Sequence, residues 1–569
     1  MAAAPWLEHY DSDVPANIGA YPEKTLLDFL AGHAAGQPDQ PAILFKGTAM
    51  SWKELEEASD AFARSLTRLG VQRGERVALL LPNSPQFLIA EIGAWKCGAI
   101  VVPQNPIYSE RELRESLSTS DPETIVVLTP FYQRVKSIQS KTTVRRVIAT
   151  NIKEYLPPLL GFLFTLFMER KEGHRIELRH GDFWFRDLLA EGRTDSTPLE
   201  KPGPDDEAII LMSGGTTGTP KGVLGTHRGF VQAGTQVTTW LRKALEGSRN
   251  RVFLPLPLFH TYACTGAQSI AMIGGMPLIL IPNPRDMRDL LKTIDRERPS
   301  FLCGVPTLFN AMLKHPLVRK KKIDFSSIRV CFSGASALMN ETKRRFEEIT
   351  GGRIVEGYSL TEATMACCIN PFEGENKIGS VGMPLPDVEV LIVDADDGSK
   401  LLPIGETGEI VMRAPQLMPG YWENEEETAT MLRPAPDGLL SLYTGDLGYL
   451  DEDGYLFIVD RKKDLIKTSG YQVWPREIEE VVSSHPAVAE VGVAGVPDAR
   501  KGEAIKAWVV LLPHAAPVGE DALRSYCRER LAPYKVPSFI EFRDELPKSL
   551  VGKVLRRVLA AEAREASDI

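Results

Sequence analysis

A loop rich in glycine and hydroxyl side chains follows an apolar stretch near the middle of the chain. Residues 209–223 read IILMSGGTTGTPKGV. Glycines expose backbone N–H groups and let phosphate oxygens come close, hydroxyls add directional donors, and a lysine adds positive charge. An ordinary surface turn needs neither four hydroxyls nor a lysine. We therefore predict a phosphate-binding loop formed by Ser213, Gly214, Gly215, Thr216, Thr217, Gly218 and Lys221.

This loop differs from the P-loop of nucleoside triphosphatases. The P-loop pattern needs a lysine followed by serine or threonine at the start of a helix. Here Pro220 precedes Lys221 and Gly222 follows it. The sequence therefore does not indicate a phosphohydrolase of the kinase or GTPase type.

Together with four further stretches, the loop resembles the signature of the adenylate-forming enzymes, which include acyl-CoA synthetases, firefly luciferase and peptide-synthetase adenylation domains. The resemblance covers roughly residues 20–560, and it is greatest to bacterial long-chain fatty acid–CoA ligases. The four stretches follow in the order that this superfamily shows. They are EGYSLTE (356–362), YTGD (443–446), DRKKDLIKTSGYQ (460–472) and PKSLVGKVLRR (547–557).

The resemblance implies a reaction in two steps. A carboxylate attacks the α-phosphate of ATP, which gives an acyl-adenylate and pyrophosphate, and the thiol of coenzyme A then displaces AMP. The expected participants are therefore a carboxylic acid, ATP, Mg²⁺ and coenzyme A. Loop residues 213–222 would hold the departing β- and γ-phosphates.

The resemblance also implies roles for single residues around the phosphates. Glu362 would bind Mg²⁺, which usually takes one or two protein carboxylates besides phosphates and water. Thr361 would donate to the α-phosphate. Lys553 would be the catalytic lysine of adenylation, because it would stabilise charge on the carboxylate and the α-phosphate in the transition state.

A second group of residues would hold the nucleoside. Tyr358, preceded by Gly357, would stack on adenine. Asp446 would accept hydrogen bonds from both ribose hydroxyls, as a charged acceptor does well. Arg461 would reach the ribose or the phosphates.

In the superfamily the small C-terminal domain rotates between the two steps. By position, Lys463 is the hinge residue. Lys467 and Gly470 would face the site in the thiol-accepting orientation, where a glycine lets the pantetheine chain pass close to the backbone. A plain charged linker is the alternative reading of Lys462 and Lys463.

Three positions depart from the pattern of many relatives. Gly214 stands where many carry a hydroxyl, and Gln472 stands where some acetate-type enzymes carry arginine. Ser359 replaces a frequent glycine. Because a positive φ at serine costs on the order of 1 kcal/mol, we expect ordinary backbone there.

Fewer sequence features indicate which carboxylic acid is the substrate. Residues 437–463 resemble a fatty acyl-CoA synthetase signature, and an insertion at 151–185 resembles that of bacterial long-chain ligases. By position, the acyl pocket would include His260, Gly334, Ala335 and Ser336. A long-chain fatty acid–CoA ligase is thus favoured. The alternatives are an aryl or medium-chain acid CoA ligase, a fatty acyl-AMP ligase that loads a carrier protein, and a binding protein without catalysis. The intact Lys553, Glu362 and Asp446 argue against the last of these.

Residues 155–168, YLPPLLGFLFTLFM, are nearly all apolar. The run is too short to span a bilayer, which takes about 20 residues. It could lie in a membrane interface, line a lipid tunnel, or form an ordinary buried helix. Peripheral membrane contact is therefore left open.

Strand–helix–strand alternation positions these motifs. Apolar runs such as 76–81, 99–103, 124–128, 301–305 and 330–333 alternate with helical spacing, which predicts an α/β fold with largely parallel sheets. Beyond about residue 385, short alternating segments predict a small antiparallel β-barrel. The expected organisation is an N-terminal AMP-binding domain of two sheet subdomains plus this barrel (1–460), a hinge (461–464), and a mobile α+β C-terminal lid domain (465–569).

Composition sets outer limits. The 569 residues carry a net charge of −9, which argues against nucleic acid as a main partner. The seven scattered cysteines suggest reduced thiols, and neither a signal peptide nor a membrane-spanning stretch is visible. We expect a cytoplasmic protein, whose oligomeric state stays open, a homodimer being one option.

Overall fold

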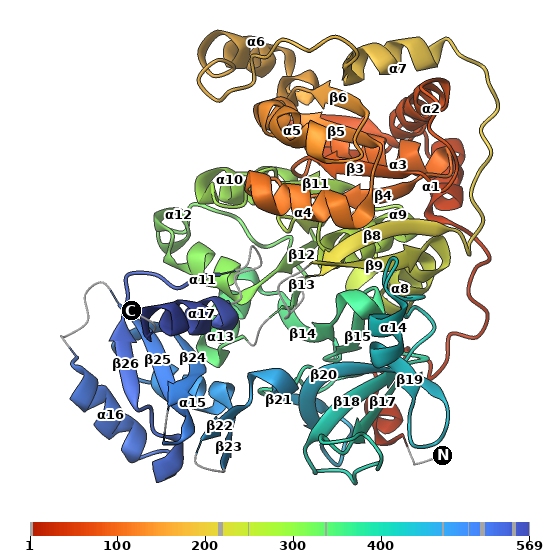
Figure 1. Cartoon of the computed structure of the whole chain (residues 1–569). Helices are drawn as coiled ribbons and strands as arrows, with labels where there is room; N and C mark the ends of the chain where they lie inside the picture. Colours follow the sequence, from red (N-terminus) through yellow and green to blue (C-terminus); the bar gives the residue numbers. More distant parts are fainter. Residues whose placement is uncertain are drawn as a thin grey trace.

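Sheets and helices alternate along most of the chain, as the sequence predicts (Figure 1). The computed structural model describes residues 4–213, 220–247, 250–335, 338–468, 471–498, 500–512, 518–548 and 554–567. Within these ranges the strands form two large mixed sheets, a smaller antiparallel sheet, and a C-terminal sheet that has its own helices. The predicted fold class is thereby confirmed.

The first large sheet has seven strands, and every neighbouring pair is parallel except the last. Its strands read as near-continuous apolar runs because helices cover both faces. In spatial order they are β7 (Phe183–Trp184), β6 (Arg146–Thr150), β5 (Thr124–Leu128), β3 (Arg76–Leu80), β4 (Ile100–Pro103), β8 (Glu207–Ser213) and β9 (Lys221–Thr226).

The second large sheet has nine strands, parallel in the middle and antiparallel at both edges. In spatial order they are β16 (Met383–Pro384), β15 (Ala366–Ile369), β14 (Arg353–Ser359), β13 (Val330–Ser333), β12 (Phe301–Gly304), β10 (Val252–Leu254), β11 (Leu278–Leu280), β1 (Pro41–Phe45) and β2 (Thr48–Ser51).

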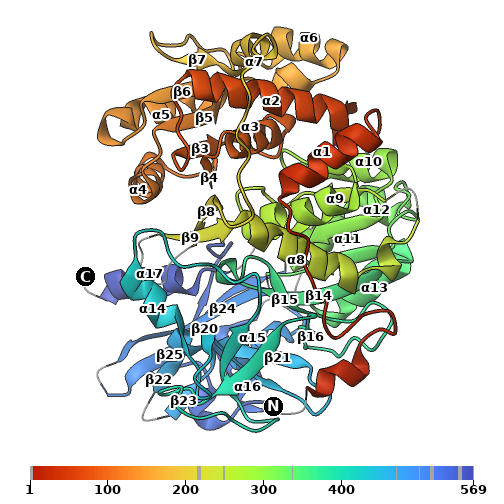
Figure 2. The ribbon, with the colours of Figure 1, turned by 90° about the vertical axis from the view of Figure 1, so that its right-hand side faces the viewer.

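Helices surround these two sheets (Figures 1 and 2). They are α1 (Leu26–Gly36), α2 (Trp52–Arg68), α3 (Pro85–Lys96), α4 (Glu110–Ser120), α5 (Tyr132–Ile138), α6 (Pro158–Phe167), α7 (Phe185–Arg193), α8 (His227–Trp240), α9 (Ser269–Gly274), α10 (Met287–Glu297), α11 (Pro306–Lys314), α12 (Pro316–Arg319) and α13 (Asn340–Thr350).

The third sheet is the small antiparallel unit that the sequence predicts, in the form of a half-barrel. Its long central strand pairs with three others, and α14 (Glu425–Met431) packs against it. The strands are β17 (Glu389–Val393), β18 (Gly408–Arg413), β20 (Leu440–Leu450), β19 (Leu432–Pro434) and β21 (Leu456–Arg461).

The C-terminal sheet begins directly after this unit. A single helical turn, Lys462–Asp464, leads from β21 into a new sheet with a separate apolar core. Its strands are β22 (Ile466–Thr468), β23 (Tyr471–Val473), β24 (Val488–Asp498), β25 (Gly502–Leu511) and β26 (Phe539–Phe542). The helices α15 (Pro475–Ser483), α16 (Glu520–Arg528) and α17 (Arg556–Ser567) accompany it.

The N-terminal segment ties distant parts of the body together. It runs along the outside of the molecule from near the third sheet up to α1 (Figure 2). The carboxylate of Asp11 accepts backbone N–H bonds from Phe372, Glu373 and Gly374 at 2.7–2.9 Å. Among the described residues, no helix is long and apolar enough to cross a membrane.

Candidate nucleotide site

A buried carboxylate lies where the second and third sheets meet. The Tyr358 hydroxyl, at the end of β14, donates to Asp446 Oδ2 at 2.5 Å. Arg461 Nε lies 3.0 Å from Asp446 Oδ1, and the Asp446 side chain is only 7% exposed. The Asp446 carboxylate raises the pKa of Arg461, and burial together with Asp446 raises that of Tyr358. The structure thus brings together three residues that the sequence assigns to the nucleoside.

A bulge in β20 aims Asp446 inward. Tyr443 pairs with Val411 and Leu447 pairs with Glu409, so three residues of β20 lie opposite one residue of β18. Gly445, in the bulge, has a φ of +68°, a conformation that glycine adopts without strain. Asp446 is the last residue of the bulge, and on the other edge of β20 it pairs directly with Arg461 of β21. This local irregularity is therefore what turns the carboxylate toward Tyr358.

Lys221 lies at the base of the predicted phosphate loop. Strands β8 and β9 bring Ser213 and Lys221 opposite each other. The segment 420–424 pairs with β9, which places the Lys221 ammonium against Glu427 and 5.6 Å from the centre of the Tyr421 ring. These residues line a cleft of about 420 Å³. The loop residues Gly214, Gly215, Thr216, Thr217 and Gly218 lie outside the described residues.

Glu362 connects the Lys221 group with the Asp446 group. It belongs to a turn, Thr361–Ala363, that starts two residues after β14 ends. Glu362 Oε1 accepts a hydrogen bond from Tyr421 at 2.8 Å. No described residue bonds Oε2 or the Thr361 hydroxyl. As far as the described residues go, one carboxylate oxygen and one hydroxyl therefore stay available, which fits a Mg²⁺ ion held mainly by phosphate and water.

The backbone at Gly357, a predicted nucleotide-binding residue, and at Ser359, one of the departures, has a clear physical explanation. A Cβ at position 357 would lie 2.5 Å from the Phe332 ring, so only glycine fits this close contact. Ser359 has no positive φ and pairs with Ala366 of β15. The prediction of ordinary backbone at Ser359 is confirmed.

Gly334 and Ala335, two of the predicted acyl-pocket residues, directly follow β13, and the Tyr262 ring, two residues after His260, packs against this end of the sheet. His260 precedes a buried π-helix, Tyr262–Gln268. The Tyr262 hydroxyl donates to the carbonyl oxygen of Phe332 at 2.6 Å, and a Cβ at Gly334 would touch the Tyr262 ring at 3.4 Å. Ala335 has a φ of +69°, which is strained for a residue with a side chain. Ser336 lies outside the described residues.

His260 is a neutral side chain in this setting. Burial lowers its pKa to about 4. The Tyr262 backbone N–H donates to His260 Nδ1 at 3.3 Å, so the ring proton is on Nε2. His260 can therefore donate one hydrogen bond from Nε2 without carrying charge.

The C-terminal residues of the prediction are placed only in part. Lys463 lies in the turn between β21 and β22, where loss of water contact and the charge of Arg461 lower its pKa to about 8. Lys467 lies on β22 with an exposed side chain. Gly470 and Lys553 lie outside the described residues.

Sequence reasoning missed Tyr421 and Glu427. They contact Glu362 and Lys221, respectively, from a segment about 200 residues after the loop. No motif marked them, because their placement depends on the pairing between Val223 and Tyr421.

Comparison with known proteins assigns the family. A family model described as "AMP-binding enzyme" matches residues 30–422, and one described as "AMP-binding enzyme C-terminal domain" matches residues 477–553. The chain belongs to this family. The predicted adenylate-forming superfamily is therefore confirmed.

Members of the family resemble the chain over nearly its whole length. A long-chain-fatty-acid–CoA ligase of Bacillus subtilis is 39% identical, covering 99% of this chain and 98% of that protein. One of Escherichia coli is 37% identical over 99% of both. A Mycobacterium tuberculosis fatty acyl CoA synthetase has a TM-score of 0.71 at 28% identity, over 95% of this chain and 99% of that chain. An anthranilate CoA ligase in complex with anthranoyl-AMP has a TM-score of 0.81 at 27% identity, over 98% of this chain and 99% of that chain.

We expect the His260 imidazole to stay neutral, with its proton on Nε2, from pH 8 down to about pH 5, because burial disfavours the charged ring. NMR titration of protein with labelled histidine, assigned with a His260→Gln variant, measures this directly. A titration midpoint near pH 6.5 would show that the ring is solvated instead.

Proposed function

We propose that this protein joins a long-chain fatty acid to coenzyme A with consumption of ATP. One observation carries the proposal. Residues of the adenylate signature converge around Asp446 and Lys221 in a chain that is 39% identical, over 99% of its length, to a long-chain-fatty-acid–CoA ligase. ATP, Mg²⁺ and coenzyme A are the co-reactants of this proposal.

In the first step, a carboxylate oxygen of the acid bonds to the α-phosphorus of ATP, and the bond to the β-phosphate oxygen breaks. Asp446 accepts from the ribose hydroxyls, Tyr358 stacks on adenine next to Gly357, and Arg461 reaches the ribose or the phosphates. The hydrogen bond between Tyr358 and Asp446 supports this arrangement, because it fixes both groups before the nucleotide arrives.

The phosphates are held at the other end of the site. The loop residues Ser213 to Gly218 and Lys221 bind the departing pyrophosphate, and Thr361 donates to the α-phosphate. Glu362 would hold Mg²⁺, which would neutralise charge on the phosphates. Lys221 must exchange Glu427 for phosphate oxygens, since Glu427 is its carboxylate partner in this structure.

In the second step the thiol sulfur bonds to the acyl carbon and AMP leaves. We assign the catalytic lysine of the first step to Lys553, the thiol-side residues to Lys467 and Gly470, and the hinge to Lys463. The change of sheet between β21 and β22 supports a division into 1–460, 461–464 and 465–569. The acid itself is assigned to His260, Gly334, Ala335 and Ser336; the neutral Nε2 donor of His260 and the small side chains at 334–335 support this assignment.

The first test measures AMP release with acids from C2 to C18 and with benzoate, with and without coenzyme A. We expect release that needs coenzyme A and is greatest for C12–C18 acids. If AMP release is greatest with benzoate, the substrate is an aryl acid and not a fatty acid. Release that needs an acyl carrier protein instead of coenzyme A would indicate the carrier-loading alternative.

The second test separates the two steps. Replacement Lys553→Ala should lower fatty acid-dependent exchange of pyrophosphate into ATP by on the order of a hundredfold or more, because it removes a cation from the developing charge. Transfer from supplied acyl-AMP to coenzyme A should stay within about threefold of the wild type. Lys548→Ala, whose ammonium pairs with Glu490 in the same domain, is the control. Equal loss of both steps in the Lys553 variant would refute the assignment.

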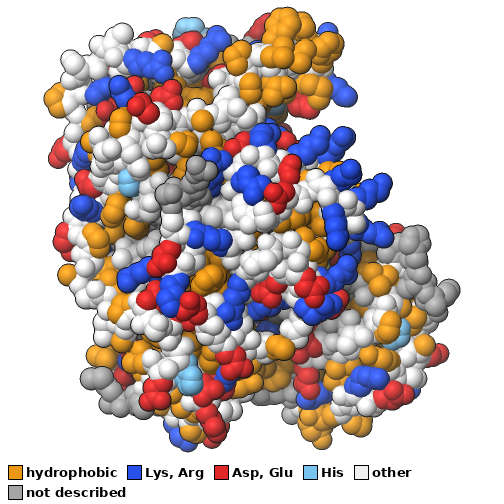
Figure 3. Space-filling view, turned by 180° about the vertical axis from the view of Figure 1, so that it is seen from behind, with side chains coloured by type: hydrophobic (Ala, Val, Ile, Leu, Met, Phe, Trp, Pro, Cys, Tyr) orange, Lys and Arg blue, Asp and Glu red, His pale blue; other side chains and the backbone are white. Residues whose placement is uncertain are grey.

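We also infer that α6 contacts a membrane surface. Six large apolar side chains of this helix are 39–69% exposed, and they form the orange patch at the upper right of Figure 3. Monomeric soluble proteins rarely expose such contiguous patches without an interaction role. The six are Leu159, Leu160, Phe162, Leu163, Leu166 and Phe167.

The charges beyond α6 indicate which surface it meets. Arg170, Lys171, Arg175 and Arg179 are exposed without an ion pair to a described residue, and they outnumber Glu172 and Glu177, which are exposed in the same stretch. Basic residues beside an exposed apolar helix favour anionic lipid headgroups, with the apolar side chains inserted among the acyl chains. A buried helix, one alternative for this segment, is not what the structure shows.

Vesicle flotation with equal parts of phosphatidylcholine and phosphatidylglycerol tests this contact. The triple variant Phe162→Ser, Leu166→Ser, Phe167→Ser should bind at least about tenfold more weakly than the wild type, because it removes three apolar anchors. The matched control Ile378→Ser, Leu439→Ser, Leu440→Ser changes side chains of similar exposure elsewhere. Equal binding of both variants would contradict the assignment of α6.

A further inference from the structure

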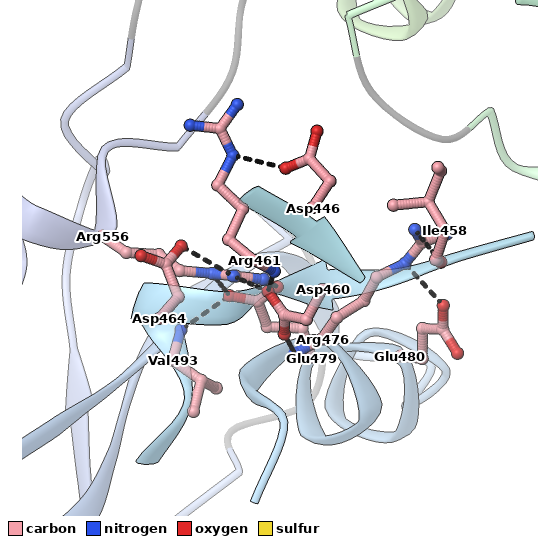
Figure 4. Close-up of polar contacts among 10 residues, drawn as sticks. All are labelled: Asp446, Ile458, Asp460, Arg461, Asp464, Arg476, Glu479, Glu480, Val493 and Arg556. Carbon is pink, nitrogen blue, oxygen red and sulfur yellow. Dashed lines mark hydrogen bonds and ion pairs between the residues drawn. The ribbon is translucent and has the colours of Figure 1, made fainter. Parts of the chain in front are cut away.

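A second buried carboxylate, Asp460, joins the C-terminal domain to the body. It lies on β21, one residue before Arg461, and its side chain is only 2% exposed. Its Oδ2 accepts the backbone N–H of Arg476, in the first turn of α15, at 2.8 Å. Its Oδ1 lies 2.5 Å from Arg556 Nη1, at the start of α17 (Figure 4). Two helices of the C-terminal domain are thus fixed to one side chain of the body.

Arg556 is in turn surrounded by carboxylates. Its Nε and Nη2 bond both oxygens of Glu479 on α15, at 2.9 and 2.5 Å. Its Nη1 also lies 3.3 Å from Asp464 in the turn after β21 (Figure 4). Because buried charges are stable only when they are paired and hydrogen-bonded, removing Arg556 leaves the Asp460 carboxylate without its cationic partner. Removing Asp460 leaves Arg556 paired with Glu479 and Asp464 but no longer joined to β21.

These contacts differ in which parts of the chain they join. Arg556 and Glu479 both belong to the C-terminal domain, so a rotation of that domain leaves their pair intact. Asp460 precedes the turn Lys462–Asp464, whereas Arg476 and Arg556 follow it. A large rotation about that turn must therefore break both bonds to Asp460. The contact between Arg476 Nη1 and the Ile458 carbonyl, 2.7 Å long, must break as well.

Arg556 also lies three residues after Lys553. An antiparallel bridge between Lys548 and Val554 joins the two ends of the stretch that contains this lysine. In Figures 1 and 2, α17 runs from the middle of the molecule outward to the C-terminus, so Arg556 is at the inner end of the helix. Fixing Arg556 to Asp460 therefore fixes the start of α17, two residues after the bridge at Val554.

We propose that Asp460 and Arg556 form a clamp that holds the C-terminal domain in the adenylating orientation and must open for the thiol step. Both are positioning residues, which act through Lys553. The proposal rests on the two-step function above. It adds a specific contact whose formation favours the first step over the second.

The test measures the two steps separately in Arg556→Gln and Asp460→Asn. Fatty acid-dependent pyrophosphate exchange into ATP should fall on the order of tenfold in each variant, while transfer from supplied acyl-AMP to coenzyme A should stay within about twofold or rise. The double variant should resemble the single ones, since the two residues act as one unit. Equal loss of both steps would overturn the clamp, because a merely destabilised fold impairs both alike.

The matched control is Arg543→Gln. Arg543 Nη1 bonds Glu562 on α17 at 2.6 Å and its Nε bonds Glu541 at 2.6 Å, so it also anchors α17, but entirely within the C-terminal domain. Both steps should stay within about twofold in this variant. A first-step loss as large as that of Arg556→Gln would overturn the proposal.

A second readout does not depend on catalysis. The end of β21 and the turn after it contain three trypsin sites, Arg461, Lys462 and Lys463. Opening the clamp should speed cleavage there at least about fivefold in Arg556→Gln, but not in Arg543→Gln. Unchanged cleavage would overturn the clamp. If the wild-type protein shows no fatty acid-dependent pyrophosphate exchange, the proposed function is refuted. The trypsin cleavage rates then still test whether the contact between Asp460 and Arg556 holds the domain.

Discussion

The buried carboxylate of Asp446 is the interaction on which the candidate site depends. A charge that is 7% exposed needs close partners, and it finds them in Tyr358 of the second sheet and Arg461 at the end of the third. This requirement fixes how the two sheets meet. It also places the nucleoside residues together before any ligand binds, so little reorganisation is needed.

Strand β21 also connects the nucleoside residues to the C-terminal domain. Successive side chains of a strand point to opposite faces. Arg461 therefore faces Asp446 in the site, while its neighbour Asp460 faces Arg556 and the start of α15. One strand thus carries both the nucleoside contact and the attachment of the domain that would supply Lys553. A change in domain orientation is coupled by geometry to the edge of the site.

Much of this could be predicted from local patterns. The apolar runs at 76–81 and 124–128 became β3 and β5, and the adenylate motifs identified Tyr358, Glu362, Asp446 and Arg461. Contacts between distant segments were beyond local reasoning. Asp460 and Arg556 are 96 positions apart, and neither residue type marks a pair.

The other features that the sequence did not predict also depend on contacts between distant segments. Strands β1 and β2 precede the first sheet in the sequence, yet they complete the second, because β1 pairs with β11. The apolar run at 155–168 was visible in the sequence, but the sequence left open whether it would be buried; the structure has an exposed helix at 158–167. Exposure is decided by what the rest of the fold leaves uncovered.

The most direct test of the account follows the oxygen atoms of the acid. Palmitate labelled with ¹⁸O in its carboxylate is incubated with the protein, ATP, Mg²⁺ and coenzyme A, and the nucleotide product is analysed by mass spectrometry. If the carboxylate attacks the α-phosphate, the AMP that is released carries one ¹⁸O. The label in inorganic phosphate, or a product other than AMP, would contradict adenylate formation at this site.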